Sequence, residues 1–164
     1  MKIIFLDIDG VLNSDEYFDK IKYLKIEGIE SEIDRKKVKL LQEAVKQTGA
    51  KVVLTSSWRY TKRAKELKEF LAQHEIPIDV TPFLDNIRGE EIKKWLSQNK
   101  NIDDFVIVDD EVFQSFDEEL IEKLIKISDG NGKTLGNGLE KQDIEKIIQR
   151  LGRKIQKEQE EYER

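Results

Sequence analysis

A short apolar run near the start of the chain, within residues 2–6, limits the folds that this sequence can adopt. The run is rich in residues that favour β-structure, and it is continuous rather than alternating with polar residues. Continuous runs of this kind are typical of strands buried on both faces, which occur mainly in parallel sheets covered by helices. Similar runs follow at residues 51–54 and 105–108. The sequence therefore predicts an α/β fold.

Apolar side chains at helical spacing separate these predicted strands. The first stripe ends at Gly49, a residue type that often ends helices, and Thr61 is predicted to cap a second helix. Four stripes are formed by Val38, Leu41, Ala44, Val45 and Thr48; by Ala64, Leu67, Phe70 and Leu71; by Ile92, Trp95 and Leu96; and by Ile144, Ile147, Ile148 and Leu151. Residues 117–128 are predicted to form a turn of helix and then a strand. This alternation predicts a doubly wound, Rossmann-like and mainly parallel sheet.

The length of 164 residues indicates a single domain with room for a proper core. We expect this domain to span residues 1–151. Almost every residue from 153 onward is charged or polar, so residues 152–164 are expected to form a charged helix end or tail.

Composition excludes several classes of protein. The chain has no cysteine, which excludes disulfides, thiolate zinc sites and cysteine nucleophiles. Its net charge of −5 gives no overall attraction for nucleic acid or anionic membranes, so any contact with a polyanion must be local. No apolar run near the start is long enough for a signal peptide or a membrane span. We therefore expect a soluble, cytoplasmic protein.

Reactive side chains follow three of the predicted strands. They are Asp7 and Asp9 after the first, Thr55 and Ser56 after the second, and Asp109 and Asp110 after the third. Ligands of open α/β sheets bind beyond the carboxyl ends of the strands, so we expect these groups to meet at one edge. Asp7 and Asp9 are two residues apart and should point to the same side, because side chains alternate along an extended segment.

Carboxylates crowded in this way repel by about 4 kcal/mol per pair at about 4 Å and an effective dielectric of about 20. A divalent cation would relieve the repulsion, and an all-oxygen cluster favours Mg²⁺ over zinc or copper. A single acid after a buried strand often only caps the next helix or begins a turn. The combination of acids after two strands favours a shared magnesium ion.

Three segments carry a resemblance to a known family. "FLDIDGVLN", "VVLTSSWR" and "FVIVDD" resemble motifs I, II and IV of the haloacid dehalogenase-like (HAD) phosphatase superfamily. The segments "RGEEIKKWL" and "GNGLEKQDIEKIIQRL" are similar to a small group without a cap domain, described as HAD domains of RNA repair proteins. The resemblance covers residues 2 to about 151 and implies the HAD fold.

The resemblance implies a role for each acid. Asp7 would be the nucleophile that forms an aspartyl-phosphate, and Asp9 would be the general acid and base. Family members without an acid at the second position carry out other chemistry, so Asp9 favours a phosphatase. Mg²⁺ would be held by Asp7, the Asp9 carbonyl and Asp109, with Asp110 acting through water or orienting the other ligands.

The remaining motif positions are less specific. Thr55 is the expected hydroxyl donor to the transferring phosphoryl group, and Ser56 is the alternative one position later. The resemblance implies that the single lysine of motif III pairs with the nucleophile and the phosphate. Lys94 is the expected lysine, because its distance from Arg88 resembles that in the phosphatase domain of polynucleotide kinase. Lys93 is the alternative. For both lysines, the competing interpretation is an ordinary surface residue on a solvated helix face. Arg88 is a candidate phosphate clamp.

Two segments bear on the substrate. Residues 13–30 form a flap too short to be a cap domain, and the open site that this implies favours large substrates such as oligonucleotide ends or proteins. The flap carries Tyr17, Phe18 and Tyr23 among lysines, which suits either base stacking or the packing of a half-buried helix. The second segment is residues 58–65, "WRYTKRAK", in which Arg59 is predicted to bind a second phosphate through two hydrogen bonds. Trp58 and Trp95 are predicted to pack in or around the core.

The sequence thus predicts a Mg²⁺-dependent phosphomonoesterase that acts on nucleic-acid ends, above all 3′-phosphates, or on nucleotides, with repair proteins as possible partners. A phosphatase for small metabolites is the nearest alternative. A module that binds a phosphorylated nucleotide without hydrolysing it is a second one. A phosphate-accepting receiver domain fits poorly, because its acceptor aspartate follows a middle strand, where this chain has Thr55 and Ser56.

Overall fold

The computed structural model describes residues 1–130 and 135–154, and within them five strands form one sheet in the order β3-β2-β1-β4-β5. Every pair of neighbouring strands is parallel. The strands are β1 (Lys2–Leu6), β2 (Lys51–Leu54), β3 (Ile78–Val80), β4 (Asp104–Asp109) and β5 (Leu124–Lys126). The predicted doubly wound α/β fold is confirmed, and the described strands are all parallel rather than mainly so.

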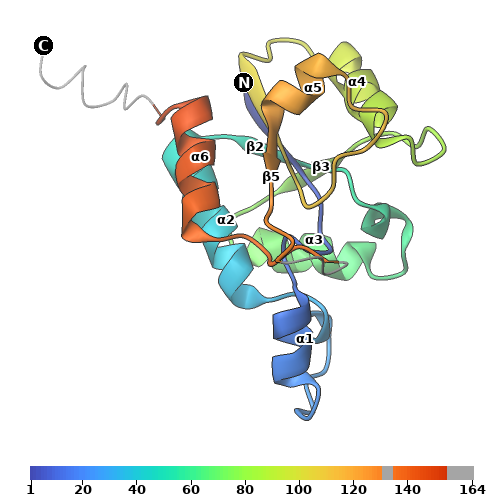
Figure 1. Cartoon of the computed structure of the whole chain (residues 1–164), viewed down its shortest axis with the longest axis vertical. Helices are drawn as coiled ribbons and strands as arrows, with labels where there is room; N and C mark the ends of the chain where they lie inside the picture. The colour runs from blue at the N-terminus through green and yellow to red at the C-terminus, as the bar shows by residue number, and fades with distance from the viewer. Residues whose placement is uncertain (131–134, 155–164) are drawn as a thin grey trace, which may run out of the picture.

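Helices cover both faces of the sheet (Figure 1). One face packs against α2 (Arg35–Thr48), α3 (Ala64–Gln73) and α6 (Lys141–Leu151). The other packs against α4 (Arg88–Gln98) and α5 (Glu118–Lys123). The shorter helix α1 (Asp15–Ile21) and the 3₁₀ turns η1 (Ile29–Ser31) and η2 (Ser57–Tyr60) lie in the connections. The two layers of helices bury the sheet on both sides, as the continuous apolar strands require.

The central strand β1 contributes to both halves of the core. Ile4 and Leu6 belong to one cluster and Ile3 and Phe5 to the other, and all four are fully buried. The ring of Phe5 meets Trp95 edge to face, with 5.5 Å between the ring centroids. Because β1 pairs with β2 on one side and β4 on the other, the residues after β1 lie at the middle of the carboxyl edge.

Several local predictions are confirmed. Gly49 ends α2 in a left-handed conformation with φ 71°, which a glycine adopts without strain. The ambiguous segment 117–128 does form a short helix and then a strand. Strand β3 was not predicted, because it is only three residues long and none of its side chains is fully buried.

The predicted cap at Thr61 is wrong. Helix α3 begins at Ala64, and its first turn receives no side-chain cap from Arg63. The Thr61 hydroxyl instead donates to the carbonyl oxygen of Trp58 at 2.8 Å. The 3₁₀ turn η2 separates β2 from α3, and the Thr61 backbone N–H donates to the same Trp58 carbonyl at 3.1 Å, so Thr61 ends η2 rather than capping α3.

The flap contains α1, which has no buried residue and projects from the carboxyl edge of the sheet (Figure 1). It ends before α2, which is capped by the side chain of Asp34. At the other end, α6 stops at Leu151, and residues 155–164 of the charged tail predicted for 152–164 lie outside the described residues. Among the described helices, none is both long and apolar enough to cross a membrane.

Candidate active site

Three carboxylates converge at the carboxyl edge of the sheet. One oxygen from each of Asp7, Asp109 and Asp110 lies within 4.8 Å of the other two. Parallel pairing of β1 with β4 brings them together, because Leu6 is opposite Val108 and the Asp7 N–H donates to the Val108 carbonyl at 3.0 Å. The predicted convergence of acids from two distant segments is therefore present.

Arg88 supplies a positive charge to this cluster. Its Nη1 lies 2.8 Å from Asp109 Oδ2 and 3.2 Å from Asp7 Oδ1. The residue is the first of α4, and its guanidinium lies 4.6 Å from the centre of the Phe113 ring. A phosphate clamp was the expected role of Arg88; the structure places it directly against the two buried carboxylates.

Burial dominates the electrostatics of the cluster. Burial, followed by repulsion from Asp109, raises the pKa of Asp7 well above its usual range, although Arg88 opposes the change. Burial likewise raises the pKa of Asp109 to about 6 against the attraction of Arg88. Burial by itself would lower the pKa of Arg88, but Asp7 and Asp109 outweigh it and raise this pKa above its ordinary value. One guanidinium therefore does not satisfy the carboxylates, and the cluster favours a further cation.

Close backbone approach holds Asp110 in the cluster. The Gly136 N–H donates to Asp110 Oδ2 at 2.8 Å. A Cβ atom on Gly10 would lie 2.0 Å from that same oxygen, and Gly10 has a φ of 80°. A glycine is thus required at position 10 both for the turn after Asp9 and for the room that Asp110 occupies.

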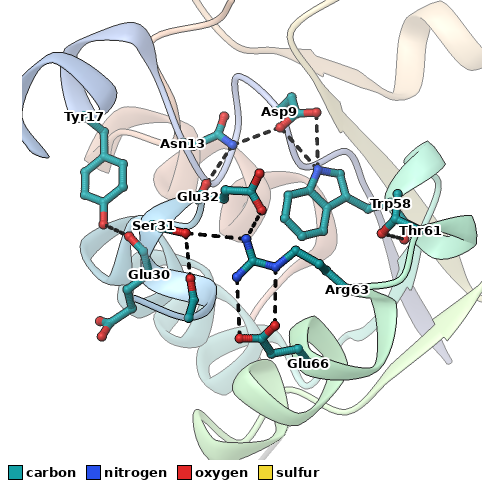
Figure 2. Close-up of polar contacts among 11 residues, drawn as sticks. Asp9, Asn13, Tyr17, Glu30, Ser31, Glu32, Trp58, Thr61, Arg63 and Glu66 are labelled. Atoms are coloured by element: carbon teal, nitrogen blue, oxygen red, sulfur yellow. Dashed lines mark hydrogen bonds and ion pairs between the residues drawn. The ribbon is translucent and has the colours of Figure 1, made fainter. Parts of the chain in front are cut away.

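Asp9 is exposed, and two side chains donate to its carboxylate (Figure 2). The Trp58 indole N–H lies 3.3 Å from each carboxylate oxygen, and the Asn13 amide donates to Oδ1 at 2.9 Å. Trp58 is nearly buried, as predicted, but its N–H was not expected at the site. Asn13 was not predicted either; its place in the first motif, four residues after Asp9, was the available signal.

The same amide ties the motif to the base of the flap. Asn13 Nδ2 also donates to the Glu32 carbonyl at 2.9 Å, while the Glu32 side chain pairs with Arg63 of the segment before α3 (Figure 2). Arg63 in turn pairs with Glu66 at 3.3 Å. On the flap itself, the Tyr17 hydroxyl donates to the Glu30 carbonyl. Glu32, at the base of the flap, is thereby anchored both to the first motif and to the segment before α3.

Both motif II hydroxyls are buried and already make contacts. Thr55 Oγ1 donates to the Leu6 carbonyl at 3.1 Å. Ser56 Oγ accepts from the backbone N–H of Trp58 at 3.2 Å and caps η2. Since a hydroxyl has a single proton, Ser56 keeps its proton available in this arrangement, whereas Thr55 would have to turn away from Leu6 to donate elsewhere.

Arg59 makes contacts other than those expected of a phosphate clamp. Its guanidinium forms an ion pair with Glu91 at 2.7 Å, and the two side chains are 2% and 1% exposed. It also donates to the carbonyls of Thr81 at 3.2 Å and Ser56 at 2.8 Å. A side chain buried and occupied in this way joins η2 to the end of β3 and to α4, and it does not reach out to a second phosphate.

The two candidate lysines lie on the outer face of α4. Lys93 and Lys94 are exposed, and Lys93 pairs with Asp117. Ile92 and Trp95 of the same helix are buried, so the helical repeat turns the lysines toward solvent. The contact with Asp7 that was expected of Lys94 is made by Arg88, six residues earlier at the start of the helix.

A comparison with known protein families matches residues 3–135 to the family described as the HAD domain in Swiss Army Knife RNA repair proteins. The chain belongs to this family of HAD domains. The matched region contains β2, β4 and all of β1 except Lys2, together with all the acids described above. Comparisons with curated proteins and with solved structures gave no match. The resemblance inferred from the motifs is confirmed over residues 3–135, and the similar segment at 136–151 lies beyond the match.

The acids of this HAD domain fit a magnesium ion. The donors are all oxygens, and the cluster contains no His or Cys. Its three carboxylates can carry more negative charge than the single positive charge of Arg88 balances. Hard oxygen donors from carboxylates are the ligands that Mg²⁺ prefers. Asp7, Asp109 and Asp110 would hold the ion, with the Asp9 carbonyl as the further ligand that the resemblance implies.

The cluster predicts that stability depends jointly on pH and Mg²⁺. Because the pKa of Asp109 is raised to about 6, the metal-free folded state binds protons more readily than the unfolded state. The stability gained from this protonation is present at low pH and lost as the pH rises through about 6. Above that pH the ionised acids can bind Mg²⁺, which should raise the melting temperature by about 5–10 °C at about 100 times its dissociation constant.

Thermal unfolding at several pH values, with chelator or with Mg²⁺, measures this dependence. The increase caused by Mg²⁺ should shrink as the pH falls below about 6. Asp109→Asn should lose the increase. An equal increase in the variant would show that the ion binds elsewhere.

Proposed function

We propose that this HAD domain is a Mg²⁺-dependent phosphomonoesterase that acts through an aspartyl-phosphate intermediate on nucleic-acid ends, above all 3′-phosphates. The main support is the arrangement of the two motif I acids. Asp7 is buried in the carboxylate cluster, whereas Asp9 is exposed beside it and accepts hydrogen bonds from two donors. Two carboxylates in such different environments suit two different tasks.

In the first half-reaction, an Asp7 oxygen attacks phosphorus and the bond from phosphorus to the leaving oxygen breaks. Asp9 in its protonated form gives its proton to that oxygen, so the product leaves as an alcohol. Arg88 lies against Asp7 and would also face the equatorial oxygens of the phosphoryl group, where it stabilises the charge of the transition state.

In the second half-reaction, the Asp9 carboxylate removes a proton from water, which attacks the phosphorus of the aspartyl-phosphate. The bond between phosphorus and Asp7 breaks, so that inorganic phosphate leaves and both acids regain their starting states. Bound Mg²⁺ would supply positive charge between an anionic nucleophile and an anionic substrate. Ser56 or Thr55 would donate to the phosphoryl oxygens.

The openness of the site supports a large substrate. The flap is a single short helix with a turn, and its base is anchored beside the acids through Asn13 and Glu32. Membership in a family of RNA repair proteins supports a nucleic-acid end over a small metabolite.

Phosphate release from matched substrates tests the proposal. With Mg²⁺ present, 3′-phosphorylated oligonucleotides should be hydrolysed faster than 5′-phosphorylated ones, free mononucleotides or sugar phosphates. Hydrolysis of sugar phosphates alone would point to a metabolite phosphatase. Recovery of intact, bound oligonucleotide after incubation with Mg²⁺ would point to a module that binds without turnover.

Trp58→Phe should impair general acid catalysis by Asp9. The change keeps an aromatic ring in the nearly buried site but removes the N–H that lies 3.3 Å from both Asp9 oxygens. We expect kcat to fall by about 3- to 10-fold, with an unchanged KM. This loss is smaller than the loss of a buried hydrogen bond to a charged group would cause, because Asp9 is exposed and Asn13 still donates to it. Alkyl phosphates should be affected more than activated aryl phosphates, whose leaving groups need little protonation.

The chain offers a matched control. Trp95 also donates its indole N–H to an aspartate, Asp79, at 3.0 Å, but this pair joins α4 to β3. Trp95→Phe should leave kcat and its dependence on the leaving group as in the unsubstituted protein. Equal losses in the two variants would mean that Trp58 acts only through packing.

A further inference from the structure

Two aromatic rings are exposed together at the carboxyl edge of the sheet. Tyr60 is the last residue of η2 and is 48% exposed; Phe83 follows β3 and is 56% exposed. Their ring centroids lie 5.1 Å apart and the rings are nearly perpendicular, at 86°. Large apolar side chains exposed in contact with each other, rather than singly, mark a binding surface. We call this pair the aromatic platform.

A buried ion pair holds the platform in place. The Arg59 guanidinium lies 4.3 Å from the centre of the Tyr60 ring and pairs with Glu91 beneath it. Arg59 Nε donates to the Thr81 carbonyl at 3.2 Å, and Glu91 accepts from the Leu84 N–H at 2.9 Å. The segments that carry Tyr60 and Phe83 are therefore fixed to each other before any ligand arrives, which lowers the entropic cost of stacking on them.

The platform is close to the proposed phosphoryl site along the chain. Tyr60 is five residues after Thr55, and Phe83 is five residues before Arg88. Five residues span at most about 18 Å between Cα atoms when fully extended, so the backbone that carries each ring lies within that distance of the backbone of a site residue. This distance is within the reach of a short nucleic-acid strand whose terminal phosphate is at Asp7, and such a strand has a flat base on every nucleotide.

We propose that the aromatic platform of Tyr60 and Phe83 stacks a nucleobase near the phosphorylated end of a single-stranded nucleic-acid substrate. This inference rests on the proposed function. Every base has a π-face, so the platform would hold the strand without selecting its sequence. The exposed side chain of Lys62, two residues after Tyr60, offers a charge for the backbone of the same strand.

Oligonucleotide kinetics test the platform against a substrate that has no ring. Tyr60→Ala and Phe83→Ala should each lower kcat/KM for a 3′-phosphorylated single-stranded oligonucleotide by about 5- to 150-fold, which corresponds to about 1–3 kcal/mol of stacking per base. Hydrolysis of glycerol 2-phosphate should remain unchanged in both variants. Tyr60→Phe should retain the activity, because the ring rather than the hydroxyl makes the contact.

Tyr23→Ala is the matched control, because Tyr23 lies on the flap and, at 88%, is the most exposed aromatic residue in the described part of the chain. It should leave the oligonucleotide kinetics unchanged. If Tyr23→Ala weakens the oligonucleotide while the platform variants do not, the bases stack on the flap and the inference is overturned. Normal oligonucleotide kinetics in both platform variants, with glycerol 2-phosphate still hydrolysed, would overturn the inference but leave the proposed function standing.

A binding measurement separates the two failures. Fluorescence anisotropy of a labelled single-stranded oligonucleotide, with the unsubstituted protein and the two alanine variants, reports on stacking without turnover. Weaker binding in the variants supports the platform even if no phosphomonoester is hydrolysed, in which case only the proposed function fails. Equal binding by all three proteins would show that the rings do not stack the strand and would overturn the inference.

Discussion

Replacing Asp7 by asparagine is expected to abolish phosphomonoester hydrolysis while leaving the protein folded. The amide cannot form the acyl-phosphate, so kcat should fall by at least about 10⁴-fold. Stability should be unchanged or higher. Burial and Asp109 raise the pKa of Asp7, which means that the ionised carboxylate is unfavourable in the folded state at neutral pH. Phosphate release and thermal unfolding of the same preparation measure both effects.

Asp103→Asn is the control for this substitution. Asp103 precedes β4 at the opposite edge of the sheet, and its side chain is 76% exposed where it pairs with the N-terminus. The control should keep full activity. Retention of hydrolysis by Asp7→Asn would refute the assignment of the nucleophile, whereas loss of folding would contradict the electrostatic argument.

Arg88→Met should have the second largest effect. The substitution removes the positive charge that lies 2.8 Å from Asp109 and 3.2 Å from Asp7, while a similar apolar length remains against Phe113. Loss of one group that stabilises transition-state charge should lower kcat by about 10²- to 10³-fold. The metal-free protein should also lose stability, by less than the about 3–5 kcal/mol typical of a broken buried ion pair, because the acids can take up protons instead.

Lys94→Ala distinguishes this assignment from the one suggested by the sequence. Lys94 is exposed on α4, so its loss should change kcat by less than about twofold if Arg88 fills the motif III role. A large loss in Lys94→Ala together with a small one in Arg88→Met would restore the lysine to that role. Steady-state kinetics with one oligonucleotide substrate decide between the two residues.

The sequence predicted the parts of the site that depend on strands. Asp7, Asp109 and Asp110 each follow a continuous apolar run, and parallel pairing of such runs brings their ends to one edge whatever the details of packing. The sequence could not predict strand β3 in the same way, because three residues without a fully buried side chain give no periodic signal.

Side chains that reach across the fold were not predictable from spacing. Arg59 was expected to bind phosphate, but it pairs with Glu91, which is 32 residues away in the chain. The two side chains meet between η2 and α4, and both are buried. The contact of Trp58 with Asp9 joins residues 49 apart. Such pairs depend on the angle at which η2 and α4 meet the sheet, and local sequence does not specify that angle.

The amino-acid sequence by itself determined the α/β class and the meeting of the acids at one edge, because these follow from hydrophobic periodicity and from the direction of parallel strands. It also determined the family, through the resemblance of its motifs. Only the tertiary structure decided which cation faces Asp7, which donors hold Asp9 and that Arg59 is buried. These features depend on rotamers and distances of a few ångströms between elements far apart in the chain. Packing of the whole core sets those distances, and no local pattern contains them.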